Sequence, residues 1–218
     1  VDTKTKKISI QKKRVFSFNE SGVYFSNKFE GARLNNVNQL NDSTYILSIL
    51  PENKPINDSP YYAFKIWSSS TKKVLLKFQY PINFKHRYIP KIKSNGIWKT
   101  ADSLNFKFDD NLSSLTIKIN DNPKTISGQE LHTSSIVYNW VDQLISGKES
   151  YIKFKEIGKT KLNRPFKVLD IYKGVPKNKP VIVILTRQHP PEVTGYFAFK
   201  VFLNTILKEN KLSSIFLD

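Results

Sequence analysis

Short segments in which apolar and polar residues alternate follow one another from residue 14 to about residue 120. Clusters of Asn, Asp, Ser, Pro and Gly separate these segments, and no helical stripe interrupts the series. A period of two residues is typical of strands with one buried face, and regular turns between them favour two packed antiparallel sheets. We therefore expect an antiparallel β-sandwich. The clearest segments are 16–18, 62–66, 74–80 and 115–119, with turns expected at Ser94-Asn95-Gly96 and Asp109-Asp110-Asn111.

The apolar period changes near residue 134 to spacings of one, three and four, which predicts an amphipathic helix. Ser134 or Ser135 is expected to cap this helix, and Gly147 to end it. Strands are expected at 151–157 and 166–172. The unbroken apolar run 181–185 predicts a central strand covered on both faces. The mostly apolar stretch 193–207, entered through two prolines, predicts a buried helix.

These patterns predict an α+β chain of two domains. Residues 1–125 form the antiparallel β-sandwich, and residues 126–218 form the start of an α/β domain. The second domain is too short to cover both faces of its predicted sheet, and a soluble domain does not tolerate such exposure. We therefore expect either that the chain is a fragment or that a further polypeptide completes the domain.

Composition limits the chemistry of the chain. Its formal net charge of +17, from 35 basic and 18 acidic residues in 218, favours anionic partners. Most basic residues are scattered lysines, whereas base and phosphate recognition favours arginine, so no specific nucleic-acid partner is expected. There is no cysteine, which leaves His, Asp and Glu as metal ligands. No apolar run is long enough to span a membrane, and the start indicates a soluble chain that is already trimmed.

His189-Pro190-Pro191-Glu192 places a nitrogen ligand and a carboxylate three residues apart in the loop before a predicted helix. Zinc accepts such ligands, and a catalytic zinc site has three protein ligands with an open position for water. By spacing alone the motif also fits an exposed helix start, with Glu192 near the positive end of the helix dipole. His86 adjoins Lys85 and Arg87, and His132 lies in the connecting segment, so both are expected to be exposed polar residues. Glu130 is expected to be a solvated linker residue.

Several motifs, spread over most of the chain, resemble motifs of the cytosolic-carboxypeptidase-like branch of the zinc metallocarboxypeptidases. Their order and spacing also agree with that branch. Segments 22–27 (GVYFSN), 59–66 (SPYYAFKI) and 88–91 (YIPK), with Trp98 after them, resemble the N-terminal sandwich domain of that branch. Residues 157–160 (IGKT) with Arg164 resemble a peptidase segment written Gly-x-Ser-x-x-Gly-Arg. Residues 181–195 (VIVILTRQHPPEVTG) resemble the strand, metal loop and helix of the active site.

The resemblance implies that His189 and Glu192 are two zinc ligands and that Arg164 contacts the substrate backbone. Thr160 and Asn163 stand where the family usually has Ser and Gly, so Arg164 is equally well explained as a surface residue that pairs with a carboxylate. The family's third ligand, a histidine, its Asn-Arg pair for the substrate carboxylate and its glutamate general base would all follow Asp218.

The function expected of the intact protein is hydrolysis of C-terminal residues from peptides or protein tails, with zinc as cofactor. The lysine-rich surface would attract acidic tails. The 218-residue chain alone is expected to be inactive, because it lacks the third ligand and the general base. The alternative is a non-catalytic module that binds a peptide or a polyanion on a carboxypeptidase-like scaffold. The compartment stays open between the cytoplasm and the periplasm or exterior, after removal of a signal.

Overall fold

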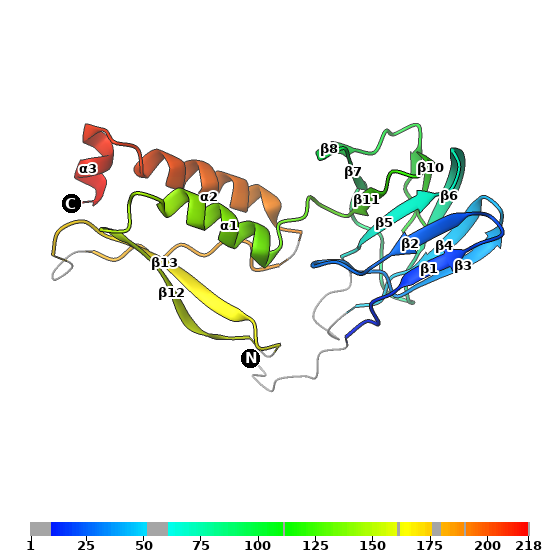
Figure 1. Cartoon of the computed structure of the whole chain (residues 1–218), viewed down its shortest axis with the longest axis horizontal. Coiled ribbons are helices and arrows are strands. Elements are labelled where there is room, and N and C mark those ends of the chain that lie inside the picture. The colour runs from blue at the N-terminus through cyan, green and yellow to red at the C-terminus, as the bar shows by residue number, and fades with distance from the viewer. Residues whose placement is uncertain are drawn as a thin grey trace. The chain divides into compact units, whose positions relative to one another are not determined.

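The computed structural model describes residues 10–51, 61–110, 112–160, 162–175, 180–189 and 191–217. The chain forms two compact units, Val1–Leu131 and His132–Asp218, and most of their elements are labelled in Figure 1. Most of the regular structure is β, with antiparallel sheets and three helices in the described ranges, so the fold is α+β. Four residues of the motifs above lie outside these ranges: Ser59, Pro60, Asn111 and Pro190.

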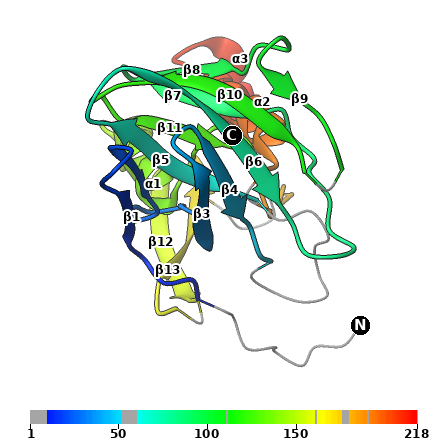
Figure 2. The ribbon, with the colours of Figure 1, turned by 90° about the vertical axis from the view of Figure 1, so that its right-hand side faces the viewer.

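The first unit consists of two sheets, and Figure 2 shows most strands of the second sheet side by side. The first sheet has the order β1-β2-β5-β11-β7-β8 and the second the order β3-β4-β6-β10-β9. The strands are β1 (Val15–Phe18), β2 (Val23–Ser26), β3 (Asn36–Asn41), β4 (Thr44–Ser48), β5 (Ala63–Ser68), β6 (Lys72–Gln79), β7 (Lys91–Ser94), β8 (Ile97–Thr100), β9 (Phe106–Lys107), β10 (Ser114–Ile119) and β11 (Lys124–Ser127).

One hydrophobic core joins the two sheets, which makes the unit a β-sandwich. Along β6, the buried Val74, Leu76 and Phe78 alternate with less buried neighbours, as the period of two residues predicts. Between the sheets, the Phe25 and Tyr45 ring centroids lie 5.2 Å apart. The expectation of purely antiparallel pairing is wrong at one place, because β4 and β6 pair in parallel. The intervening β5 belongs to the other sheet, so the chain leaves the second sheet and re-enters it in the same direction.

His86 is buried within this sandwich, which corrects the expectation of an exposed residue. Its Nδ1 lies 2.9 Å from the Tyr80 hydroxyl and its Nε2 lies 2.7 Å from the Tyr88 carbonyl oxygen. Its backbone N–H donates to the carbonyl of Asp110 at 2.8 Å. The neighbouring cations of the sequence do not decide its exposure, because the Lys85 side chain is itself exposed and pairs with Asp110.

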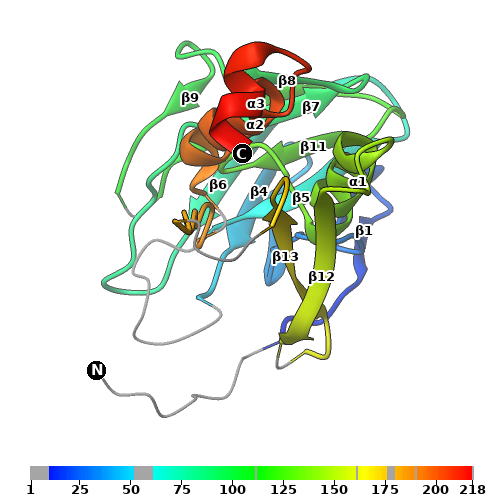
Figure 3. The same ribbon diagram turned by 90° about the vertical axis from the view of Figure 1, so that its left-hand side faces the viewer.

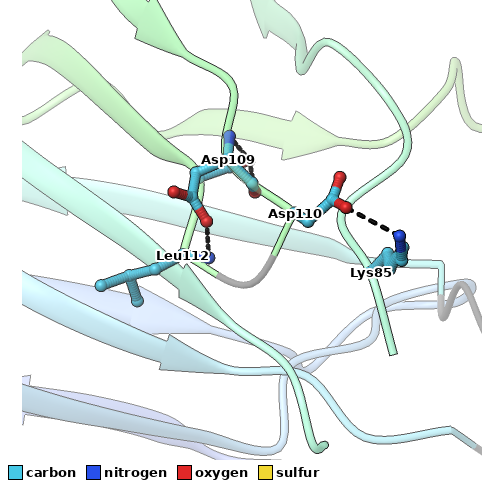
Figure 4. Close-up of polar contacts among 5 residues, drawn as sticks. Lys85, Asp109, Asp110 and Leu112 are labelled. Atoms are coloured by element: carbon cyan, nitrogen blue, oxygen red, sulfur yellow. Dashed lines mark hydrogen bonds and ion pairs between the residues drawn. The ribbon is translucent and has the colours of Figure 1, made fainter. Parts of the chain in front are cut away.

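Hydrogen bonds and an ion pair hold the turn between β9 and β10, as Figure 4 shows. The Asp109 carboxylate accepts the N–H of Leu112 at 3.0 Å, and Lys85 Nζ lies 2.8 Å from Asp110 Oδ2. The Ser113 hydroxyl donates to the Asp109 carbonyl at 2.6 Å. Side-chain capping of backbone groups by Asp is the turn chemistry that the sequence predicts.

The second unit contains a β-hairpin and three helices, of which Figure 3 shows the hairpin beside α1. The predicted first helix is confirmed as α1 (Ser134–Ile145), although Thr133 rather than a serine caps it, by accepting the N–H of Ile136. Gly147 follows the helix with φ +76°, as predicted for its end. The hairpin strands are β12 (Ile152–Lys159) and β13 (Pro165–Ile171), and the other helices are α2 (Val193–Ile206) and α3 (Lys211–Leu217).

Residues 181–185 do not form the central strand that their apolar run predicts. They are assigned to no strand, and the exposed fractions of their side chains range from 44% at Ile184 to 84% at Val181. The only β-pairing in the described part of this unit joins β12 to β13, so no strand neighbours the run there. Helix α2 is confirmed, but it buries one side only: Val193, Tyr196 and Leu203 are buried, whereas Val201 is 66% exposed. The prediction of a buried helix therefore holds for one side of α2 only.

Candidate metal centre

His189 and Glu192 lie together at the start of α2. His189 Nδ1 is 2.6 Å from Glu192 Oε1, and the backbone N–H of His189 donates to Glu192 Oε2 at 3.0 Å. Glu192 is the N-cap residue of α2, yet its side chain makes no hydrogen bond to the helix. Its carboxylate folds back over the loop instead, which brings the nitrogen and oxygen donors of the motif to one point.

The surroundings of Glu192 favour its charged form. The hydrogen bond with the His189 side chain, followed by the bond from the His189 backbone, lowers the pKa of the Glu192 carboxyl below its ordinary value. The side chains of His189 and Glu192 are 59% and 51% exposed, so an ion can reach both from solvent. The pair thus offers an imidazole and an ionised carboxylate, a donor set that zinc accepts.

Two donors are fewer than a zinc site needs. No group of three or more His, Asp or Glu side chains with metal-binding geometry occurs in the described ranges. His86 engages both ring nitrogens, and burial lowers its pKa to about 4, so it is a neutral core residue. His189 and Glu192 therefore fit zinc as a partial site. Their side chains now contact each other, and each would exchange that contact for the ion.

His132 packs against α2 and is half-buried, so it is not the exposed polar residue expected. Its ring centroid lies 5.0 Å from that of Tyr196 and 5.1 Å from that of Phe197. Burial, with the charges of Arg187 and Lys200, lowers the pKa of His132 to about 4. These neighbouring cations oppose binding of a metal ion by its imidazole.

Aromatic rings and cations cluster around Tyr196 of α2, and sequence reasoning missed this cluster. The Tyr196 side chain is 3% exposed, and the Arg187 guanidinium lies 6.0 Å from its ring centroid. Lys200 Nζ lies 4.9 Å from the Trp140 ring centroid, on α1. Arg187 has φ +52°, a left-handed conformation that turns the chain just before His189. The apolar period of α2 could have indicated that Tyr196 is buried. The position of Arg187 depends on the conformation of the loop, which the sequence pattern does not show.

Arg164 lies on the β12–β13 hairpin, exposed and immediately before β13. Its backbone N–H donates to the Thr160 hydroxyl at 3.2 Å, and the Thr160 N–H donates to the Arg164 carbonyl at 2.8 Å. Asn163 has φ +57°, a conformation in which Gly is favoured and Asn is tolerated. The two departures from the family pattern are therefore compatible with the turn, and the substrate role of Arg164 stays a prediction.

Comparison with known proteins identifies the scaffold. Residues 137–215 match the family model of the zinc carboxypeptidases. No curated protein sequence gives a significant match. Among the described residues, no helix has the length and apolarity needed to cross a membrane.

Solved structures of metallo-carboxypeptidases share the fold of the chain. The metallo-carboxypeptidase of Burkholderia cenocepacia aligns with a TM-score of 0.69 at 11% identity, over 86% of this chain and 50% of that one. The metallo-carboxypeptidase of Pseudomonas aeruginosa, in complex with (2-guanidinoethylmercapto)succinic acid, aligns with a TM-score of 0.64 at 10% identity, over 86% and 50%. The chain thus spans about half the length of these structures. Residues 137–215 are thus similar in sequence to the zinc carboxypeptidases, and the chain shares the fold of solved metallo-carboxypeptidases.

Proposed function

We propose that the intact protein is a zinc-dependent metallocarboxypeptidase that removes C-terminal residues from peptides or protein tails. The observation that carries this proposal is the 2.6 Å contact between His189 Nδ1 and Glu192 Oε1. It occurs inside the segment that matches the zinc carboxypeptidase family model. The assignment to the cytosolic-carboxypeptidase-like branch rests on the motifs of the sequence and belongs to the same proposal.

His189 and Glu192 supply two of the protein ligands in this proposal. Zinc bound there would lower the pKa of its water towards 7 and polarise the scissile carbonyl. Glu192 is suited to the task because its lowered pKa keeps the carboxylate ionised at neutral pH. Arg164 would position the substrate backbone, and the third ligand and general base come from a polypeptide beyond residues 1–218.

Exposed apolar surface in the second unit supports such a completing polypeptide. The run 181–185 is unpaired and exposed, although its sequence is typical of a buried strand. Phe166 and Val168 on β13 are also 56% and 38% exposed. Large exposed apolar side chains in such number are typical of a protein interface. Strands added beside the run would bury it and hold the metal loop at the edge of a completed sheet.

The test measures zinc content and peptidase turnover of the full-length protein and three variants. We expect one zinc per chain, lost together with turnover in His189→Ala and Glu192→Gln, because removal of a ligand lowers metal affinity by more than the roughly 10- to 100-fold typical of outer-shell changes. Gln188→Ala, an exposed neighbour in the same loop, is the matched control and should retain both.

Two outcomes would contradict the proposal. Zinc binding and turnover that persist without His189 would remove its ligand role, and turnover by residues 1–218 alone would refute the need for a completing polypeptide. A full-length protein that binds peptides without zinc or turnover would instead establish the alternative, a non-catalytic peptide- or polyanion-binding module.

A further inference from the structure

A groove of about 720 Å³ lies in the first unit, where the ends of the two sheets lie against each other. Its walls come from β6, β7, β8, β10 and β11, together with the segment that links β8 to β9. It is separate from His189 and Glu192, which belong to the second unit. The proposed peptidase chemistry makes no use of it.

The groove is strongly basic. Lys73, Lys99, Lys118 and Lys124 line it, against a single acidic residue, Asp102. The Asp102 carboxylate accepts the N–H of Leu104 at 2.8 Å, within its own turn. No ion pair joins any of the four lysines to another residue in the described ranges. Clustered like charges repel one another, so a ligand that supplies several negative charges gains from all four.

Half of the ten other lining residues are apolar. Ile97 is 62% exposed, whereas Leu115 and Ile117 are buried residues of the sandwich core that also reach the groove. Apolar side chains of this kind pack against the methylene groups of a ligand. A suitable occupant therefore carries anionic groups on short alkyl arms, as glutamate side chains do.

An edge strand runs beside the groove. Strand β8 is the last strand of its six-stranded sheet, and Ile97, Lys99 and Thr100 of β8 line the groove. An edge strand presents unpaired backbone donors and acceptors, to which an extended peptide can add as a further strand. In contrast, the described lining contains no aromatic residue and no arginine, which single-stranded nucleic acids use for stacking and phosphate recognition.

We infer that this groove binds an extended, acidic peptide segment alongside β8. The lysines contact its carboxylates, and Ile97 contacts its alkyl groups. Binding requires no free C-terminus and no zinc, so it is independent of the proposed peptidase function.

The test uses the full chain and a fluorescent oligoglutamate peptide of roughly ten residues, about 33 Å long when extended. Its C-terminus is amidated, so that a carboxypeptidase site does not recognise it. Fluorescence anisotropy should show binding that weakens as salt is raised, because exposed charges are screened. Lys99→Gln with Lys118→Gln should weaken binding roughly threefold to tenfold, as expected for two surface charge contacts.

Lys12→Gln with Lys28→Gln is the matched control. It removes the same charge from exposed residues next to β1 and β2, at the opposite end of the first sheet, and should leave affinity unchanged. Charge reversal, Lys99→Glu with Lys118→Glu, should abolish oligoglutamate binding. Circular dichroism verifies that each variant is folded.

Three results would overturn the inference. Absence of oligoglutamate binding at low salt would show that the groove is not a binding site. Equal loss of affinity in both double variants would show that only the general charge of the chain attracts the peptide. Stronger binding of single-stranded DNA of equal charge, sensitive to the same two lysines, would assign the groove to a polynucleotide instead.

Discussion

The imidazole of His86 shows how one residue can make folding depend on pH. It is 2% exposed and lies among aromatic rings, with the Phe78 centroid at 5.1 Å and the Phe106 centroid at 5.3 Å. Burial disfavours its charged form, and the hydrogen bond to the Tyr88 carbonyl offsets part of that effect. The folded chain therefore holds a neutral His86 at pH values at which an exposed histidine is protonated.

This difference predicts acid destabilisation of the first unit. The pKa of His86 is about 4 in the folded chain and 6.5 without burial, so only the unfolded state takes up the proton between these values. The free energy of unfolding should be unaffected by this group above pH 6.5 and fall as pH decreases towards 4, by at most about 3 kcal/mol. Urea denaturation at several pH values measures the fall.

His86→Gln supplies the comparison, because glutamine retains hydrogen-bonding groups and does not titrate. The variant should lose less stability between pH 6.5 and 4 than the unchanged chain does. Equal pH dependence of the two proteins would show that His86 is not protonated on unfolding in this range.

At the scale of elements, the two ends of α1 follow rules that the sequence already carries. Thr133 caps the first turn, and Gly147 lets the chain turn away in a left-handed conformation with φ +76°. A Cβ at Gly147 would meet no atom within 4 Å, so the backbone conformation alone requires glycine there. Gly158 in β12 also has open space around it, but no left-handed φ.

This contrast predicts different effects of the same substitution. Gly147→Ala should lower the free energy of unfolding by about 1 kcal/mol, because the left-handed conformation is costly for a residue with a Cβ. Gly158→Ala should leave it unchanged or raise it slightly, because Ala loses less conformational entropy in a strand. Equal losses in both variants, measured by chemical denaturation, would refute the conformational explanation.

At the scale of the whole molecule, the two units have very unequal cores. The core of the sandwich includes large, fully buried side chains such as Tyr45, Tyr62 and Phe64. The corresponding cluster of the second unit has Ile152, Leu207 and Leu217 as its buried members. Because buried apolar area is the main favourable term in folding, the second unit should be much the less stable.

We therefore predict two unfolding transitions in calorimetry of the 218-residue chain, the second unit melting first. Leu76→Ala should destabilise the later transition by about 2–5 kcal/mol, and Leu207→Ala should lower only the earlier one. A single transition that both substitutions lower equally would show that the chain folds as one cooperative body. A completing polypeptide should raise the earlier transition selectively.

The sequence by itself determined the local features of this protein. Alternation along β6 and β10 indicated strands, the stripe of α1 indicated a helix, and the spacing of His189 and Glu192 placed two donors in one loop. These features depend on residues a few positions apart, whose directions a strand or helix fixes.

Contacts between distant residues were decided by the tertiary structure alone. They include the parallel pairing of β4 and β6 and the assembly of the basic groove from five strands. They also include the burial of His86, although its charged neighbours in the sequence had indicated an exposed residue, and the exposure of residues 181–185. An apolar run indicates what a segment can bury, but a strand forms only where another strand supplies hydrogen-bond partners. Side-chain periodicity shows which residues share one face of a helix or strand. Whether that face is buried, and which strand pairs with it, depends on the segments of the chain that pack against it.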